Sequence, residues 1–291
     1  MKDLAEIIFK SILLAAFAPL VTGYIAKLKN VFRMRKGPGV LQPYYNLIKL
    51  FQKDEVVSKH ASWVFAVTPI AVFAGTVCAM VLVLSASLLD SASEVAVVLL
   101  ASFFVMGSVR FFSALAGLDA GSAFGGMGSS REVFISGLAE PSLFISVFAL
   151  CISGSSIFKL SVLLGGISVF LVALAETSRI PIDNRETHLE LTMVHEAMVL
   201  EYSGRSLAVI EFANHIKQTL FFVLILWFFA MPLKRCAWGW TLLPAEIAVL
   251  GLLIAVIEVS FAKMRLFRVV DFMGFAFFIA LAASVAACLG L

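Results

Sequence analysis

Residues 62–89 read SWVFAVTPIAVFAGTVCAMVLVLSASLL and contain no Asp, Glu, Lys or Arg. This segment is longer than the roughly 20 apolar residues that a helix needs to cross the hydrocarbon core of a bilayer. The whole chain shares its character, since 61% of the 291 residues are hydrophobic, 14% are charged, and mean hydropathy is +1.02. Soluble domains average about 45–50% apolar and about 25% charged residues. The sequence therefore predicts an all-α polytopic membrane protein, with residues 1–291 forming a single membrane domain.

Apolar segments of similar length recur along the chain, and together they predict about eight transmembrane helices. The expected spans are residues 4–25, 62–89, 94–117, 132–153, 157–177, 209–231, 243–262 and 270–290. No internal repeat is evident, which argues against transporter folds built from inverted repeats.

The basic residues predict the orientation of these helices. Most of the 22 Lys and Arg residues fall in the loops after the first, third, fifth and seventh spans. Because cytoplasmic loops carry the excess of Lys and Arg, both termini are expected on the outer side of the cytoplasmic (inner) membrane. The long loops 26–61, 118–131 and 178–208 are then cytoplasmic, and loops of this size on one face predict docking to other proteins.

Several classes of function are excluded. The net charge of +3 provides no clustered basic face, so no nucleic-acid partner is expected. The lipid bilayer is an expected partner of the apolar spans. The four cysteines form no C-x-x-C pair, which argues against an iron–sulfur or zinc site. His195-Glu196 is not followed by the second His of a zinc protease motif. We therefore expect no catalytic, cofactor-binding or metal-binding residue in this chain.

Ionisable residues inside apolar spans are the main functional signal, because each costs roughly 2.5–3.5 kcal/mol to insert and so marks a site or pathway. Glu132 and Glu140 lie two helical turns apart on one face. Glu211, Asn214, His215 and Gln218 form a second polar stripe, with Lys217 beside it. Glu176 ends the fifth span, and Glu258 lies near the cytoplasmic end of the seventh.

Two interpretations of these residues remain open. Carboxylates, His and Lys in a medium of low dielectric can exchange protons near neutral pH, which predicts a proton or ion path. Alternatively, Arg110 or Lys217 neutralises a carboxylate, and the ion pairs serve only to fix helix packing.

Three loop motifs identify a family. Residues 35–43 (RKGPGVLQP), 175–183 (AETSRIPID) and 201–204 (EYSG) resemble the family of subunit 1 of respiratory complex I, in the same order and over most of the chain. Residues 186–198 (ETHLELTMVHEAM) are similar to a branch of that family, the membrane anchor of group 4 energy-converting [NiFe] hydrogenases of the formate hydrogenlyase and CO-linked types. The first loop is also shorter than in quinone-reducing complexes.

The resemblance implies a membrane anchor and coupling subunit, rather than a chain that catalyses a reaction. Its implied partners are the [NiFe] hydrogenase large and small subunits, an iron–sulfur subunit and antiporter-like membrane subunits. The [NiFe] centre and iron–sulfur clusters are expected on those partners. The positions matching the family's acidic row are Glu132, Glu140, Glu176, Glu190, Glu201 and Glu211.

Spacing alone adds His215, Lys217 and Glu258 to this expected path. Docking of the redox arm is expected at Arg33, Arg35 and Lys36, and at Arg179 and Asp183 in the fifth loop. The alternatives are the quinone-chamber subunit of a NADH:quinone oxidoreductase (complex I), a stand-alone ion transporter and a purely structural anchor.

Overall fold

The computed structural model describes residues 2–57, 61–89, 91–153, 159–183, 194–229 and 239–290. The regular structure in these ranges is entirely helical, which confirms the predicted all-α class. The elements are α1 (Lys2–Phe32), α2 (Gln42–Phe51), α3 (Trp63–Ser85), the short 3₁₀ helix η1 (Ala86–Leu88), α4 (Ala92–Asp119), α5 (Ala123–Ser153), α6 (Leu160–Glu176), α7 (His195–Val199), α8 (Gly204–Phe229), α10 (Gly239–Ser260) and α11 (Leu266–Cys288).

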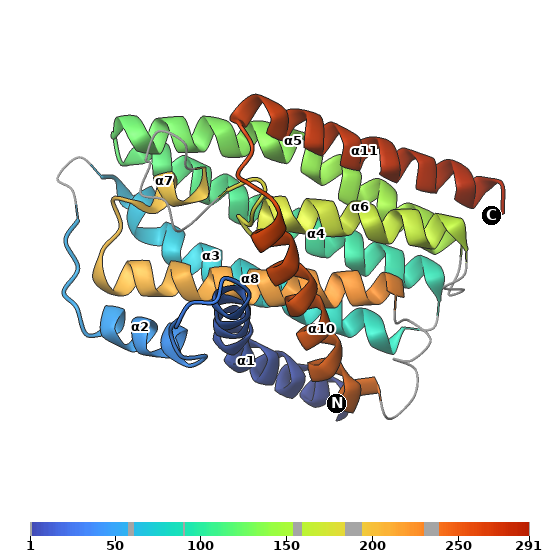
Figure 1. Cartoon of the computed structure of the whole chain (residues 1–291), viewed down its shortest axis with the longest axis horizontal. Coiled ribbons are helices and arrows are strands. Elements are labelled where there is room, and N and C mark those ends of the chain that lie inside the picture. The colour runs from blue at the N-terminus through green and yellow to red at the C-terminus, as the bar shows by residue number, and fades with distance from the viewer. Residues whose placement is uncertain are drawn as a thin grey trace.

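Seven helical segments within the described ranges are long and apolar enough to cross a membrane, and α6 is a shorter apolar helix at the fifth predicted span. Each of the eight predicted spans therefore corresponds to one helix. Figure 1 shows α2 and α7 at one end of the bundle and the C-terminus at the opposite end. The side of the membrane that each end faces stays a prediction from the basic loops.

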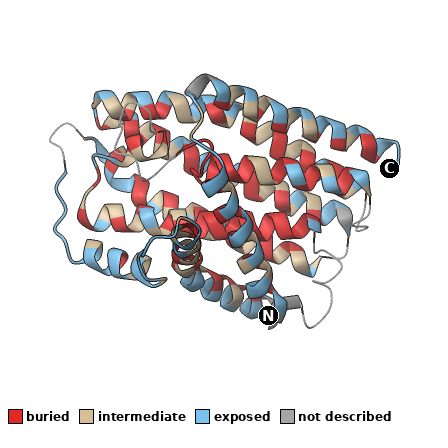
Figure 2. Cartoon of the chain, viewed as in Figure 1, coloured by how far each residue is buried: buried red, intermediate tan, exposed pale blue. Residues whose placement is uncertain are grey.

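Helix α8 occupies the middle of the bundle, where α1, α3, α6 and α10 pack against it (Figure 1). Its residues from Ile216 to Phe228 are buried on every side, as Figure 2 shows for the centre of the molecule. A helix that is apolar all round is typical of a protein core or of a membrane span. The central position of α8 places its polar residues between α1 on one side and α3 and α6 on the other.

The glycine-rich segment before the fourth predicted span is helical over most of its length. Helix α5 begins at Ala123, so the predicted loop 118–131 shortens to a brief turn between α4 and α5. Gly117 and Gly125 lie where these two helices cross, and a Cβ on Gly125 would stand 2.3 Å from the carbonyl oxygen of Gly117. These glycines therefore serve close helix packing, as small residues commonly do between membrane helices.

We expect Gly125→Ala to destabilise the protein by about 1–3 kcal/mol, because the added methyl group overlaps the backbone of α4. Gly126→Ala is the matched control, since a Cβ there meets no atom within 4 Å. The control should leave stability unchanged or raise it by up to about 1 kcal/mol, because Ala favours a helix over Gly. Thermal unfolding of the two purified variants in detergent measures the difference. Equal melting temperatures would contradict this account of the helix crossing.

Candidate functional site

Four ionisable side chains from four helices form a continuous chain of ion pairs, called here the Arg110 network. Arg110 on α4 places Nη1 3.0 Å from Glu140 Oε1 on α5 and Nη2 3.0 Å from Glu176 Oε1 on α6. Lys217 on α8 places Nζ 2.8 Å from Glu176 Oε2. Arg110, Glu176 and Lys217 are buried, whereas the side chain of Glu140 is 39% exposed. The network thus runs from the centre of the bundle to its surface.

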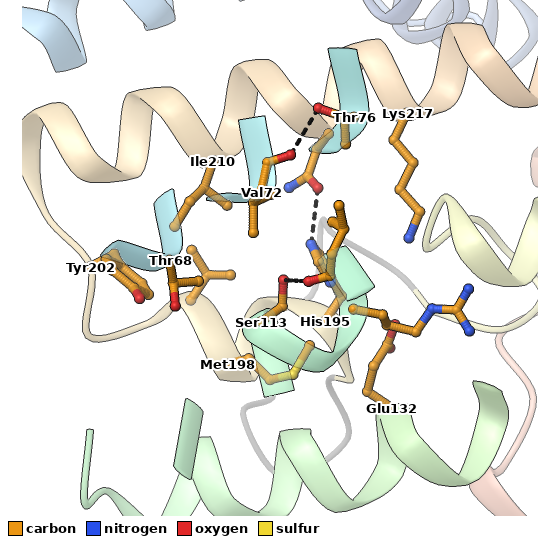
Figure 3. Close-up of a pocket in the computed structure, with 14 residues that line it drawn as sticks. Thr68, Val72, Thr76, Ser113, Glu132, His195, Met198, Tyr202, Ile210 and Lys217 are labelled. Carbon is orange, nitrogen blue, oxygen red and sulfur yellow. Dashed lines mark hydrogen bonds between the residues drawn. The ribbon is translucent and has the colours of Figure 1, made fainter. Parts of the chain in front are cut away.

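A small cavity adjoins this network (Figure 3). Glu132 of α5, His195 of α7 and Lys217 of α8 line one end of it, and Tyr202 lies at the other end. The cavity leaves about 20 Å³ for the centres of water molecules, and about 10–15 Å³ suffices for one. Arg110 also lines the cavity, and its Nε atom is buried and finds no acceptor among the described residues. The cavity is therefore both large enough and polar enough to hold water.

Neighbouring hydrogen bonds hold the cavity walls in place. His195 Nε2 lies 3.2 Å from Asn214 Oδ1, which ties α7 to α8. The Tyr202 ring stacks on Phe65 at a centroid distance of 3.9 Å, and its hydroxyl donates to the Phe65 carbonyl at 3.0 Å. Burial raises the pKa of Tyr202, so the phenol stays protonated and donates at neutral pH.

A second buried cluster, called here the Glu258 network, meets a different face of α8. Glu258 on α10 receives two cations, because Lys29 Nζ lies 2.9 Å from Oε2 and Arg179 Nη1 lies 3.0 Å from Oε1. Arg179 Nη2 also donates to Gln218 Oε1 at 2.7 Å. The Glu258 network therefore ties α1, α8 and α10 to the segment after α6.

Helix α8 connects the two networks. Lys217 belongs to the Arg110 network and the next residue, Gln218, belongs to the Glu258 network, because adjacent residues on a helix point about 100° apart. Thr22 on α1 lies beside this junction, donating to Gln218 Oε1 at 3.1 Å and lying 2.9 Å from His215 Nδ1. A shift or rotation of α8 would therefore act on both networks together.

A further ion pair closes the segment after α6. Lys263 Nζ lies 2.8 Å from Asp183 Oδ1, and Asp183 Oδ2 accepts a hydrogen bond from the Val194 backbone nitrogen at 3.0 Å. Asp183 thus joins the end of α6 to the start of α7 and to the residues after α10.

Sequence comparison identifies the family to which the chain belongs. The profile of the family described as NADH dehydrogenase matches residues 5–289, which is nearly the whole chain. The chain belongs to this family.

Two curated members of hydrogenase complexes are similar to the chain. Hydrogenase-4 component C of Escherichia coli K12 is 31% identical over 226 residues, covering 72% of this chain and 70% of that protein. Formate hydrogenlyase subunit 4 of the same organism is 28% identical over 284 residues, covering 89% and 90%. The chain is thus a membrane subunit of the complex I-like and group 4 hydrogenase family, whose members work in multisubunit membrane complexes.

A solved structure shows the same fold. A chain of the membrane-bound sulfane sulfur reductase, an archaeal respiratory membrane complex, superposes with a TM-score of 0.76 at 15% identity. The match covers 97% of this chain and 99% of that chain. At this identity the likeness establishes the family fold and leaves the chemistry to be argued from side chains.

Six of the nine expected path residues lie in or beside the two networks. Glu132, Glu140, Glu176 and Lys217 gather around Arg110, whereas Glu258 forms the Glu258 network and His215 lies beside it at Thr22. The expected single acidic row is therefore two clusters. Ion pairing is far more complete than the number of carboxylates suggested, because Lys29 and Arg179 also enter the interior.

The remaining expected path residues do not join either network. Glu201 and Glu211 are exposed, because each lies where no neighbouring helix covers its side chain. Glu190 lies outside the described residues.

The residues expected to dock the redox arm fall into two groups, one near the surface and one buried. Arg35 and Lys36 are exposed and Arg33 is half-buried, which suits a surface that receives a partner. Arg179 and Asp183 are instead 8% and 2% exposed and bonded inside the chain. Both residues are bonded inside the bundle and are not available on the surface for docking.

Sequence reasoning missed Lys29, Thr22 and Lys263. The predicted first loop includes Lys29, but α1 continues to Phe32 and carries Lys29 into the interior. Thr22 and Lys29 are seven residues apart and so share one helical face. Had the first span been predicted to extend to Lys29, this spacing would have indicated that both residues face the interior.

We expect Arg110→Met to destabilise the protein by about 3–5 kcal/mol, because it leaves Glu140 and Glu176 without their shared cation. Arg205→Met, at an exposed position on α8, is the control and should change stability by less than about 0.5 kcal/mol. Unfolding in detergent, followed by intrinsic fluorescence, compares the variants. Similar stability of both would show that the Arg110 network does not hold these helices together.

Proposed function

We propose that this chain is the membrane anchor and coupling subunit of an energy-converting [NiFe] hydrogenase, in which it links a cytoplasmic redox arm to ion-translocating membrane subunits. The observation that carries the proposal is the Arg110 network beside a cavity that can hold water. Similarity to two E. coli hydrogenase-complex subunits supports the hydrogenase branch over the quinone-reducing one.

The charges around the cavity suit controlled ion transfer. Arg110 and Lys217 balance Glu140 and Glu176, so the Arg110 network is neutral when all four are ionised. Glu132 adds a third carboxylate on the wall of the same cavity. A proton or other cation arriving there balances this charge, and Lys217 is placed to pair with Glu176 or to turn toward Glu132. The charge state of Glu132 then sets the position of the Lys217 side chain. A change in that position acts on α8, to which Lys217 belongs.

The redox chemistry belongs to partner chains in this proposal. No group of three or more His, Cys, Asp or Glu side chains in the described ranges could hold a metal ion. The [NiFe] centre and iron–sulfur clusters are assigned to the hydrogenase and iron–sulfur subunits, which dock on the cytoplasmic side around Arg33, Arg35 and Lys36. Both termini face the outer side of the cytoplasmic membrane, as the basic loops indicate.

Replacing Glu132 with Gln tests the path. We expect Glu132→Gln to lower the number of ions moved per hydrogen evolved about tenfold or more, because an amide cannot carry the proton or balance the cation. Hydrogen evolution and subunit content should be unchanged. Inverted membrane vesicles report proton movement through a pH-sensitive dye and sodium movement through radioactive sodium uptake.

Glu201→Gln is the control for this test, since Glu201 is exposed and outside both networks. It should leave ion movement unchanged. Full ion movement in Glu132→Gln would refute the path assigned to the cavity.

Purification of the tagged chain in mild detergent tests the branch. We expect the hydrogenase large and small subunits, an iron–sulfur subunit and antiporter-like subunits to co-purify, with hydrogen evolution by the complex. Co-purification of a flavin- and NADH-binding arm with quinone reduction would instead establish the quinone-chamber role.

A further inference from the structure

We propose that the groove between α1 and α10 binds one ethanolamine phospholipid, with an acyl chain in the groove, the phosphate at Lys10 and the ammonium at Glu6. The groove has a volume of about 270 Å³, and residues of α1, α8 and α10 line it. Figure 1 shows α10 beginning at the end of the bundle where the N-terminus of α1 lies. The inference goes beyond the proposed function and does not depend on it.

The lining of the groove is apolar along most of its length. Leu14 of α1 and Ile247 of α10 are buried in it, and Phe17 is 47% exposed at its rim. Thr219 of α8 also lines the groove, but its hydroxyl donates to the His215 carbonyl at 3.0 Å. A hydrocarbon chain brings no polar group that would lose a hydrogen bond on burial. This surface therefore suits an acyl chain.

The groove closes at its deep end, near Tyr24. A Cβ on Gly251 of α10 would stand 3.3 Å from Tyr24 Cδ1 and 3.4 Å from Ile25 Cγ1, so the two helices approach closely there. Lys10 and Tyr24, which line opposite ends of the α1 wall, are about 21 Å apart at 1.5 Å per residue. One leaflet of the hydrocarbon core is about 15 Å thick, which is half of the whole core. The groove is therefore long enough for a chain that crosses one leaflet.

Lys10 lies at the level of the lipid headgroups. Residues 11–26 of α1 contain no Asp, Glu, Lys or Arg. Lys10 and Lys27 bound this stretch and are about 25 Å apart along the helix. Because the hydrocarbon core is about 30 Å thick, the Lys10 ammonium lies near one edge of the core. A phospholipid places its phosphate at this edge, and a phosphate forms a charge-assisted hydrogen bond with an ammonium.

The neighbour of Lys10 selects the headgroup. Glu6 forms an ion pair with Lys10, is 55% exposed and lies about 6 Å farther out along α1. An ethanolamine phospholipid carries its charges in the complementary order, because its ammonium follows the phosphate on the side away from the acyl chains. The phosphate then meets Lys10 while the ammonium meets Glu6. A glycerol headgroup offers the same phosphate but no cation for Glu6.

A groove between α4 and α5 provides the contrast. Its lining includes Glu140 and Arg110, so it belongs to the Arg110 network already described. The described lining of the α1–α10 groove contains no carboxylate, and its one cation, Lys10, lies at the open end. A polar end joined to a long apolar wall is the distribution of polarity that a phospholipid itself has.

Photolabelling of the complete complex tests the choice of headgroup. The complex is placed in phosphatidylcholine nanodiscs with a trace of phosphatidylethanolamine that carries a diazirine in its acyl chain, or with the matching phosphatidylglycerol probe. Mass spectrometry of the peptides locates the label. We expect residues 13–24 and 243–248 to be labelled about threefold more by the ethanolamine probe, as one charge pair near a surface allows. Equal labelling by both probes, or no labelling of these residues, would overturn the inference.

Exchanging the two charges tests the headgroup contacts directly. Glu6→Lys combined with Lys10→Glu retains an ion pair between positions four apart on α1, but it places a carboxylate at the depth of the phosphate. Labelling by the ethanolamine probe should fall about threefold, to the level of the glycerol probe or below it. If the pair serves only to stabilise α1, the labelling preference will be unchanged, and the lipid contacts assigned to these residues fail.

Filling the groove is an independent test. Ala248→Trp places an indole in the groove, so labelling of both helices should fall about tenfold. Ala245→Trp is the matched control, since Ala245 is exposed on the same helix and outside the groove lining. It should retain full labelling, and unchanged subunit content would show that both variants assemble. Full labelling of Ala248→Trp would place the lipid outside the groove, and the charge exchange keeps the inference testable if this variant does not assemble.

Discussion

The pairing of Arg110 with Glu176 is the contact on which the rest of the interior depends. The hydrocarbon core provides no water to solvate a charge, so ionised groups in a span pair with one another or with backbone carbonyls, or face a water-filled cavity. Arg110 meets this demand by joining α4 to α5 and α6, and Glu176 extends the chain of charges to α8 through Lys217. Removing one member of such a set leaves others buried and uncompensated, which is the costly event. The ion pairs therefore restrict how the helices can be arranged, beyond what apolar packing in lipid can specify.

Helix α8 links the Arg110 network to the Glu258 network. Lys217 and Gln218 are consecutive, yet one contacts Glu176 and the other contacts Arg179. The segment after α6 makes the same connection, because Glu176 and Arg179 lie three residues apart and enter different networks. Two chain segments therefore connect the cavity to the Glu258 network: helix α8 through Lys217 and Gln218, and the end of α6 through Glu176 and Arg179. In the proposed function, this arrangement lets a change of charge beside the Arg110 network act on the Glu258 network.

Particular residues show how far the sequence could lead. Their presence in apolar spans predicts Glu132, Glu140, Glu176, Lys217 and Glu258 as a polar site, and the structure places all five in or beside buried networks. Lys29 escapes prediction because hydropathy alone does not locate the end of α1. A basic residue in a loop predicted to be cytoplasmic is usually exposed, which suggests docking for Arg179, whereas in the structure Arg179 is buried and bonded to Glu258 and Gln218. Glu211 was included in the predicted row because helical spacing shows which residues share a face. The spacing does not show whether a neighbouring helix covers that face.

The membrane class, the eight apolar helices and the family were predictable from the sequence, because they depend on local composition, segment length and contiguous motifs. The division of the charges into two networks, the contact of α8 with both, and the groove beside Glu140 became visible in the folded arrangement of the helices. Ion pairs join residues far apart in the chain, from Arg110 to Glu176 and from Lys29 to Glu258. Their partners depend on how helices cross in space, and helical periodicity carries no information about which face meets which neighbour.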